Sequence, residues 1–399
     1  MLTITIAERR ARLGLRHHLA ALAESPEDVA DAVVALHATD PATVFLSAIA
    51  RMQDPSIREI EAALFDRRSM MRTLAMRRTL WVPSTTFLRT VEVSSAGAIA
   101  RTERNRLEKF LAESDIDRPR HWLQSAADQV LDALSDGPLS AKGVTKAVPM
   151  LATKITMGAG TKHVVQTSAT SRTLGLLAIE GLLARGRPAG AWTGRQYEWH
   201  RRDHWLPIPD DDSDEPEASA ALVEAWLRRF GPATLNDIQW WTGWTKTKTK
   251  DALARLETAE VWLEGESNLG IVLADDLDES PTPDTWVRFL PSLDPTSMGW
   301  KDRAWYVDGY ESALFDRMGN VGPAVWHDGR IIGVWSQNAE NRLAWTLFTS
   351  PSKGLASLVR TEADRVVEVI GDTSIRPSFP TPVQKVLATQ ETVGMVELH

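Results

Sequence analysis

Apolar residues recur at helical spacing through much of the chain and at strand-like spacing in its last part. Val29, Val33 and Leu36 lie on one face of a helix that Ser25 caps and Pro26 opens. The pattern predicts helices over 26–36, from Pro41 to about residue 52 and over 56–67, and two strands closed by a turn over 71–83.

A similar order of elements recurs twice further along the chain. The pattern Gly-Pro-x-[Ser/Thr] occurs at Gly137-Pro138-Leu139-Ser140 and at Gly231-Pro232-Ala233-Thr234. In each copy a helix precedes the turn, the Ser or Thr caps the next helix, and a third helix and a hairpin follow. The expected elements are helices over 122–134 and 168–184 with a basic hairpin over 185–199, then helices over 218–230 and 249–257 with a hairpin over 261–273. This layout is typical of a winged helix, which favours a nucleic-acid partner.

The last part of the chain has a different pattern. Strands are predicted over 287–290, 324–326, 331–335 and 343–348, with an Asp328-Gly329 turn and a helix over 353–370. The predicted fold class is therefore α+β, with tandem winged-helix domains scaffolded by a C-terminal small β-barrel or sheet. We expect a first winged-helix domain over 1–118, a second over 119–207, a third over 208–285 after an acidic linker, and the barrel or sheet with its terminal helix over 286–399.

Composition narrows the function classes. The 399-residue chain has no cysteine, which excludes disulfides, thiolate metal sites and a catalytic thiol. No apolar run reaches bilayer length and the N-terminus lacks the features of a signal peptide, so we expect a cytoplasmic protein without membrane contact. Arginine far outnumbers lysine, which fits a GC-rich bacterial genome.

The net charge of −8 is unusual for a nucleic-acid binder, but it is unevenly distributed. Asp210 to Glu217 holds six acids and Asp275 to Asp284 holds five more, so the remainder of the chain carries about +3. We interpret both stretches as solvated loops, which leaves the remaining surface free to bind phosphate.

Three lysines, Lys246, Lys248 and Lys250, begin the third helix of the last repeat. Cations there oppose the positive end of the helix dipole, and a bound phosphate would relieve that opposition; a solvated helix start is the other interpretation. The tryptophans at 240, 241 and 244 are expected to form core packing rather than a stacking platform for bases. His200 and His204 have only a weak zinc-site spacing, and no nucleotide-binding motif is present. No metal or cofactor is expected.

Five segments occur in an order that resembles a known family. They are Leu36-His37-Ala38-Thr39-Asp40-Pro41, Arg72 to Leu80, Phe230 to Thr234, Leu290 to Pro295 with Arg303, and Asp328 to Trp335. Together they resemble the AlkZ/YcaQ-type winged-helix DNA glycosylases over most of the chain. The resemblance implies tandem winged helices, a C-terminal β-barrel and excision of bulky or crosslinking alkyl adducts of purines from duplex DNA.

The sequence departs from that family at its catalytic pair. Members carry Gln-x-Gln or Gln-x-Asp, and His37 and Thr39 occupy the matching positions here. An imidazole and a hydroxyl can hold a water, His37 could act as a base, and Asp40 would fix the turn or stabilise positive charge. Equally, His37 could end an apolar helix face while Asp40 only caps the next helix. Phosphate contacts are expected from Arg72, Arg77, Arg78, Lys246, Lys248, Lys250 and Arg303.

Two other functions stay open at this point. A lesion sensor or regulator would bind DNA without catalysis, although no dimerisation helix is evident and a monomer is expected. Winged helices can also bind other proteins, and the acidic net charge supports that alternative.

Overall fold

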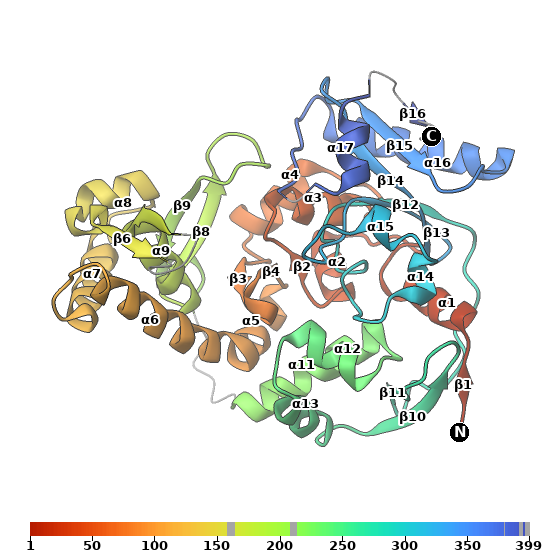
Figure 1. Ribbon diagram of the computed structural model, residues 1–399, viewed down its shortest axis with the longest axis horizontal. Coiled ribbons are helices and arrows are strands. Elements are labelled where there is room, and N and C mark those ends of the chain that lie inside the picture. The colour runs from red at the N-terminus through yellow and green to blue at the C-terminus, as the bar shows by residue number, and fades with distance from the viewer. Residues whose placement is uncertain (158–163, 208–213, 379, 391–393, 396–399) are drawn as a thin grey trace.

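The structure is a computed structural model that describes residues 1–157, 164–207, 214–378, 380–390 and 394–395 (Figure 1). It combines helices with several small sheets in a mixed α/β arrangement. β1 (Thr3–Ile4) and α1 (Ile6–Arg16) come first, and Thr5 caps α1 with its side chain. β1 pairs in parallel with residues 262–263, so the N-terminus is hydrogen-bonded to a segment far along the chain.

The first unit, from α2 to β4, consists of helices and a three-stranded sheet. Its elements are α2 (Pro26–Ala32), β2 (Leu36–His37), α3 (Pro41–Ile49), α4 (Ile57–Glu61), the π-turn η1 (Ala62–Asp66), β3 (Thr73–Leu74), the 3₁₀ turn η2 (Met76–Arg78) and β4 (Leu80–Val82). A capping box between Ser25 and Asp28 opens α2, as the sequence indicates. The predicted helix ends early, because Leu36 and His37 pair with β4 instead. The sheet order is β2-β4-β3.

A helical bridge with no counterpart in the sequence-based expectations leads to the second unit. It consists of α5 (Thr85–Val91), the π-turn η3 (Glu92–Ala96) and α6 (Gly97–Ala112). Only Leu107 and Leu111 of α6 are buried, so the helix has no wide apolar face for periodicity to reveal.

The second unit runs from α7 to α10. Its elements are α7 (Pro119–Ala133), β5 (Leu139–Ser140), α8 (Ala141–Ala147), η4 (Pro149–Ala152), β6 (Lys154–Met157), β7 (Val165–Ser168), α9 (Ala169–Ile179), β8 (Leu183–Pro188), β9 (Tyr197–Arg201) and α10 (Arg202–Trp205). Ser140 caps α8 as predicted. The helix expected over 168–184 stops at Ile179, because Leu183 begins β8. The sheet order is β5-β9-β8.

The third unit repeats this plan. It contains α11 (Glu215–Phe230), α12 (Leu235–Thr242), α13 (Lys246–Leu253), β10 (Thr258–Leu263) and β11 (Gly270–Leu273). Ala233, between the first two helices, bridges to Ile271 of β11. In all three units, therefore, the segment between the first two helices pairs with the last strand of the hairpin.

The C-terminal part is an open sheet flanked by helices. The strands β12 (Val287–Leu290), β13 (Ala324–His327), β14 (Arg330–Gln337), β15 (Leu343–Leu347) and β16 (Gly394–Met395) follow one another in that order. Its helices are α14 (Ala304–Val307), α15 (Glu311–Leu314), α16 (Lys353–Ile370) and α17 (Pro382–Ala388). The predicted strands and the helix over 353–370 are confirmed. The described residues close no barrel, so of the two forms expected the structure has the sheet.

One large core joins the first unit, the third unit and the C-terminal sheet. Trp81, Trp226, Trp241 and Trp326 are its largest fully buried aromatic side chains. Trp240 and Trp244 pack partly buried against it, so the tryptophans around α12 contribute to packing as expected. The second unit has smaller clusters of its own.

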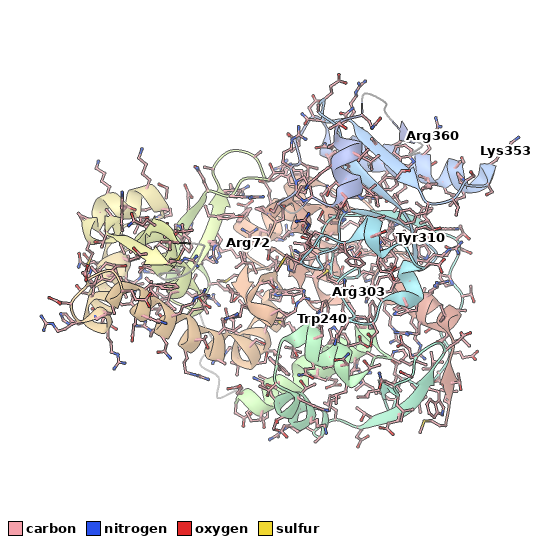
Figure 2. All side chains as sticks on the ribbon, viewed as in Figure 1. Arg72, Trp240, Arg303, Tyr310, Lys353 and Arg360 are labelled. Atoms are coloured by element: carbon pink, nitrogen blue, oxygen red, sulfur yellow. The ribbon has the colours of Figure 1, made fainter. Side chains whose placement is uncertain are left out.

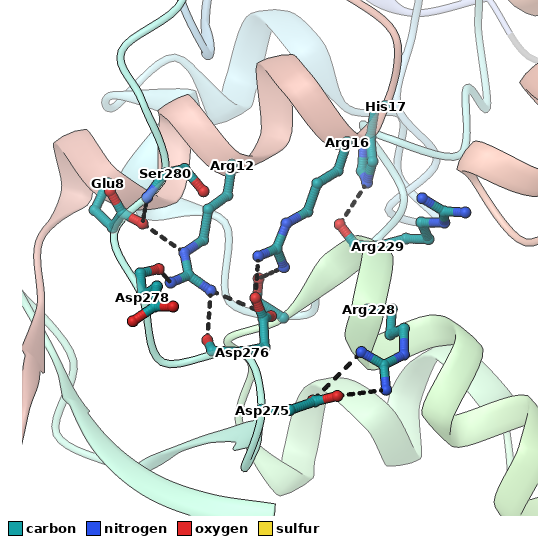
Figure 3. Close-up of polar contacts among 11 residues, drawn as sticks. Glu8, Arg12, Arg16, His17, Arg228, Arg229, Asp275, Asp276, Asp278 and Ser280 are labelled. Carbon is teal, nitrogen blue, oxygen red and sulfur yellow. Dashed lines mark hydrogen bonds and ion pairs between the residues drawn. The ribbon is translucent and has the colours of Figure 1, made fainter.

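The two acidic stretches are not simply solvated loops, contrary to the sequence-based interpretation. Asp276 accepts hydrogen bonds from Arg12 (3.3 Å) and Arg16 (2.6 Å) of α1, and Asp275 pairs with Arg228 of α11 at 3.0 Å (Figure 3). These carboxylates hold α1 and α11 to the segment after β11. In the first stretch Asp214 caps α11, and residues 210–213 lie outside the described residues.

Candidate active site and nucleic-acid interface

His37 lies on β2, an edge strand of the sheet in the first unit. It pairs with Trp81 on β4, and the Ala38 N–H extends the pairing by donating to the Leu80 carbonyl at 2.8 Å. The imidazole meets the Trp81 ring edge-on, with 4.9 Å between ring centroids. Thr39 follows two residues later, in the bend between β2 and α3.

Both side chains contain a buried polar atom without a partner. Among the described residues, neither Nδ1 of His37 nor Oγ1 of Thr39 has a hydrogen bond. The His37 side chain is only 2% exposed. Burial, assisted by the nearby charge of Arg77, lowers the pKa of His37 to about 3. The imidazole is therefore neutral at neutral pH.

Asp40 is held from three directions. Its Oδ1 accepts from the Ala42 N–H at 3.2 Å, which caps α3 as the sequence predicts. Its Oδ2 accepts from the backbone N–H (2.9 Å) and the hydroxyl (2.8 Å) of Ser378. The guanidinium of Arg195, in the β8–β9 loop, lies 3.7 Å from the same oxygen. Asp40 thus ties the segment after His37 to the C-terminal region and to the second unit.

The β3–β4 turn brings Arg77 against the third unit. Arg77 has a positive φ of 54°, and its guanidinium lies 4.2 Å from the ring centroid of Trp240 on α12. Arg303 contacts the same ring at 4.8 Å, and Figure 2 shows Trp240 and Arg303 close together. Burial and the charge of Arg303 lower the pKa of Arg77 to about 10. A β-carbon on Gly243 would come within 3.0 Å of the Arg77 backbone, so this close approach requires glycine.

Arg72 contacts the second unit instead. Its guanidinium lies 4.6 Å from the ring centroid of Tyr197 on β9. Arg185 on β8 stacks similarly on Trp199 at 4.8 Å, and burial together with the charge of Arg72 lowers its pKa to about 10. Sequence reasoning described a basic hairpin here but did not single out Arg185. The alternation of arginines with aromatic residues across that hairpin was the available signal.

The three lysines of α13 have different surroundings. Lys246 and Lys250 are exposed. Lys248 donates to the Ser94 carbonyl at 2.6 Å, pairs with Glu215 and lies 4.5 Å from the centroid of the Trp244 ring. Lys248 therefore fastens α13 to η3 and α11, whereas its two neighbours face solvent.

The described residues contain no cluster of three or more His, Asp or Glu side chains suited to a metal ion. His200 packs against Trp205, with ring centroids 4.3 Å apart. None of the helices within the described ranges is long and apolar enough to span a membrane.

The model of the family described as DNA glycosylase AlkZ-like matches residues 30–369. The chain belongs to the AlkZ-like DNA glycosylase family. The resemblance predicted from five short segments is thereby confirmed.

A match by sequence and a match by structure both lead to Streptomyces sahachiroi. The solved structure of its DNA glycosylase AlkZ has a TM-score of 0.71 to this chain at 20% identity, covering 93% of this chain and 98% of that one. The two proteins therefore share their fold. The interstrand DNA cross-link repair glycosylase of this organism is 28% identical over 177 residues, which are 42% of this chain and 46% of that protein. This alignment spans about half of the relative.

In this AlkZ-like protein, the residues predicted from sequence fall into separate groups. His37, Thr39 and Asp40 follow one another along the strand and cap that lead into α3. Arg77 and Arg303 meet on Trp240, while Arg72 meets the second unit. The α13 lysines form another group, at a different position along the third unit.

Proposed function

We propose that this protein is a DNA glycosylase that hydrolyses the N-glycosidic bond of alkylated purines in duplex DNA. Membership of the AlkZ-like family supports the class of reaction. The observation that carries the proposal is the pair of unsatisfied polar atoms, Nδ1 of His37 and Oγ1 of Thr39. Buried polar groups are nearly always hydrogen-bonded, so such a pair suits a water or a substrate group.

In this reaction the protein has two main tasks: to position a water and to stabilise the charge that develops on the sugar. Alkylation at N7 makes the purine a cationic leaving group, and the sugar develops oxocarbenium character as the base departs. A water held by the imidazole and the hydroxyl would be ready to attack the sugar. His37 is a weak base because its pKa lies near 3, so we assign it the holding of water rather than removal of a proton before bond cleavage.

Asp40 has a positioning role in this proposal. Its two oxygens already accept from Ala42 and twice from Ser378, and Arg195 compensates its charge. A carboxylate so engaged is poorly placed to stabilise a second cation. It instead fixes where the His37–Thr39 segment ends and α3 begins.

The proposed DNA contacts are Arg72, Arg77, Arg78, Lys246, Lys250 and Arg303, with Lys248 as an internal support of α13. Lysine and arginine contacts to phosphate supply most sequence-independent affinity. The repeated strand order supports three winged-helix units as the scaffold. The name of the crosslink-repair relative suggests interstrand crosslinks as a substrate class. We propose that a monomer acts.

Incubation with a duplex containing N7-alkylguanine, followed by alkali, tests the proposal. Released base and strand cleavage at the abasic site are expected for the wild-type protein. Absence of both, while the protein still binds the duplex, would contradict the proposed activity.

One observation favours a second candidate. His37 is nearly enclosed and packs on Trp81, and it replaces the glutamine of the family's catalytic pair. A protein that binds lesions without cleaving them would fit that enclosure. Binding of alkylated duplex in preference to undamaged duplex, without release of base, would identify this function.

A further inference from the structure

A basic cleft lies between the first and second units. The β3–β4 hairpin, α6, α9 and β8 surround a volume of about 410 Å³. Its charged lining consists of Arg77, Arg78, Glu103, Arg106, Arg172 and Arg185. Five arginines and one glutamate thus line the cleft, in a protein whose net charge is negative.

The single acid does not neutralise the cleft. Glu103 lies 3.5 Å from Arg78 and 3.8 Å from Arg106, both at the exposed rim. Arg77, Arg172 and Arg185 have no carboxylate partner within the part of the chain that the structure describes. The lining of the cleft therefore carries four more positive charges than negative ones.

Two of these arginines also lie where a cation is unfavourable. Arg77 and Arg185 are partly buried, each beside a second guanidinium: Arg303 in the first case and Arg72 in the second. Aromatic faces hold both in place, Trp240 for Arg77 and Trp199 for Arg185. Stacking fixes the orientation of a guanidinium but supplies no counter-charge. An anion in the cleft would supply it.

The helix that lines the cleft points to the same ligand. Ser171 and Arg172 lie in the first turn of α9, whose amide groups favour a negative charge. α9 packs against α6 and β3, and the side chains of Ser171 and Arg172 in its first turn are exposed. Contact with the nucleic-acid backbone is compatible with that position.

We propose that this cleft binds a phosphodiester of the DNA backbone, with Arg77, Arg172 and Arg185 as its contacts. The guanidinium fork matches two phosphate oxygens, which suits a stacked and pre-oriented arginine. The choice of DNA as the source of the phosphate rests on the proposed glycosylase function. The excess of positive charge is a property of the lining residues alone.

Undamaged duplex gives a test that is independent of catalysis. We expect Arg172→Gln and Arg185→Gln each to lower the slope of log K against log salt by about one, as loss of one phosphate contact should. Arg120→Gln is the charge-matched control, because Arg120 is exposed on α7 outside the cleft. It should leave the slope unchanged. Equal slopes for all four proteins would overturn the proposal.

Thermal unfolding without DNA distinguishes a ligand contact from a structural arginine. Removing an uncompensated cation beside Arg72 should leave the Tm of Arg185→Gln unchanged or raise it. A lowered Tm with an unchanged salt slope would make Arg185 structural and refute its assigned role. Binding of heparin but of no duplex at low salt would refute DNA as the ligand.

The outcomes also separate this inference from the proposed activity. If Arg172→Gln and Arg185→Gln lower the salt slope as expected but the wild-type protein releases no base, the phosphate site stands and the proposed glycosylase activity is refuted. If the wild-type protein releases base and the cleft variants bind duplex with an unchanged salt slope, the glycosylase activity stands and the phosphate site is refuted.

Discussion

At the residue scale, the account depends on the environment of one imidazole. His37 is neutral in the folded protein at neutral pH, because burial lowers its pKa to about 3. Thr39, two residues further along the chain, adds a second unsatisfied polar atom. We propose that this uncharged pair holds water at the positions where the family has its glutamine pair.

His37→Ala should lower the rate of base release by about 10²–10⁴-fold with duplex binding nearly unchanged, because it removes a group that positions water. Thr39→Ala should cost less, since one hydroxyl hydrogen bond contributes about 1 kcal/mol. Single-turnover base release and equilibrium binding measure the two effects. The matched variant His37→Gln should retain activity, and its failure to do so would argue against a water-holding role.

The depressed pKa of His37 also predicts how stability depends on pH. The unfolded chain takes up a proton near the ordinary value of 6.5, whereas the folded chain does so only near 3. Stability from the neutral imidazole is thus fully present above about pH 6.5 and declines as the pH falls toward 3. Between pH 7 and pH 5 His37→Gln should lose roughly 1–2 kcal/mol less than wild type in urea unfolding. Equal losses would show that His37 is protonated in the folded protein.

At the element scale, buried polar pairs fasten helices that are far apart in sequence. Arg51, two residues after α3, makes two hydrogen bonds to Asp294, at 2.7 and 2.8 Å, and both side chains are fully buried. Ser47 and Thr296 complete the network, and His17 after α1 joins it through Thr296. This network joins the C-terminal ends of α1 and α3 to the segment after β12.

Asp294→Asn should therefore destabilise the fold by about 3–5 kcal/mol, because it leaves the Arg51 charge buried without its partner. Asp275→Asn is the matched control, since Asp275 also pairs with an arginine, Arg228, but in solvent. Its effect on the midpoint of urea unfolding should be small. Similar midpoints for the two variants would show that the buried network does not determine stability.

Asp40 allows capping to be separated from charge. Asn at this position can still cap α3, whereas Ala cannot, so Asp40→Ala should cost about 0.5–2 kcal/mol more than Asp40→Asn in thermal unfolding. Base release by Asp40→Asn should stay close to wild type. A large loss of activity in a stable Asp40→Asn protein would assign the carboxylate to catalysis and contradict the positioning role.

At the scale of the whole molecule, local signals were predictable and distant partners were not. The caps Ser25, Asp40, Ser140 and Thr234 and the helix Lys353–Ile370 follow from sequence, because their hydrogen bonds and spacing are local. The end of α2 does not, because only pairing with β4 turns Leu36 and His37 into a strand. The same reason explains the acidic stretch around Asp276, whose partners lie on α1 at the other end of the chain.

The candidate site was predictable to a similar extent. The segment His37 to Asp40 could be found from the family pattern, but its burial and the shifted pKa depend on packing against Trp81 and on Arg77. The basic cleft gathers arginines from the hairpin, α6, α9 and β8, so no single stretch of sequence marks it. The sequence prediction therefore includes Arg77 and Arg78 of this cleft but not Arg106, Arg172 and Arg185.

The most direct test of the central claim is the single-turnover release of base from N7-alkylguanine duplex by wild-type protein and by the double variant His37→Gln, Thr39→Gln. The account predicts release by both, because either pair of side chains can hold a water beside the sugar. Release by the double variant alone would contradict it. In that case the chain has the fold of a DNA glycosylase, but His37 and Thr39 do not support the reaction.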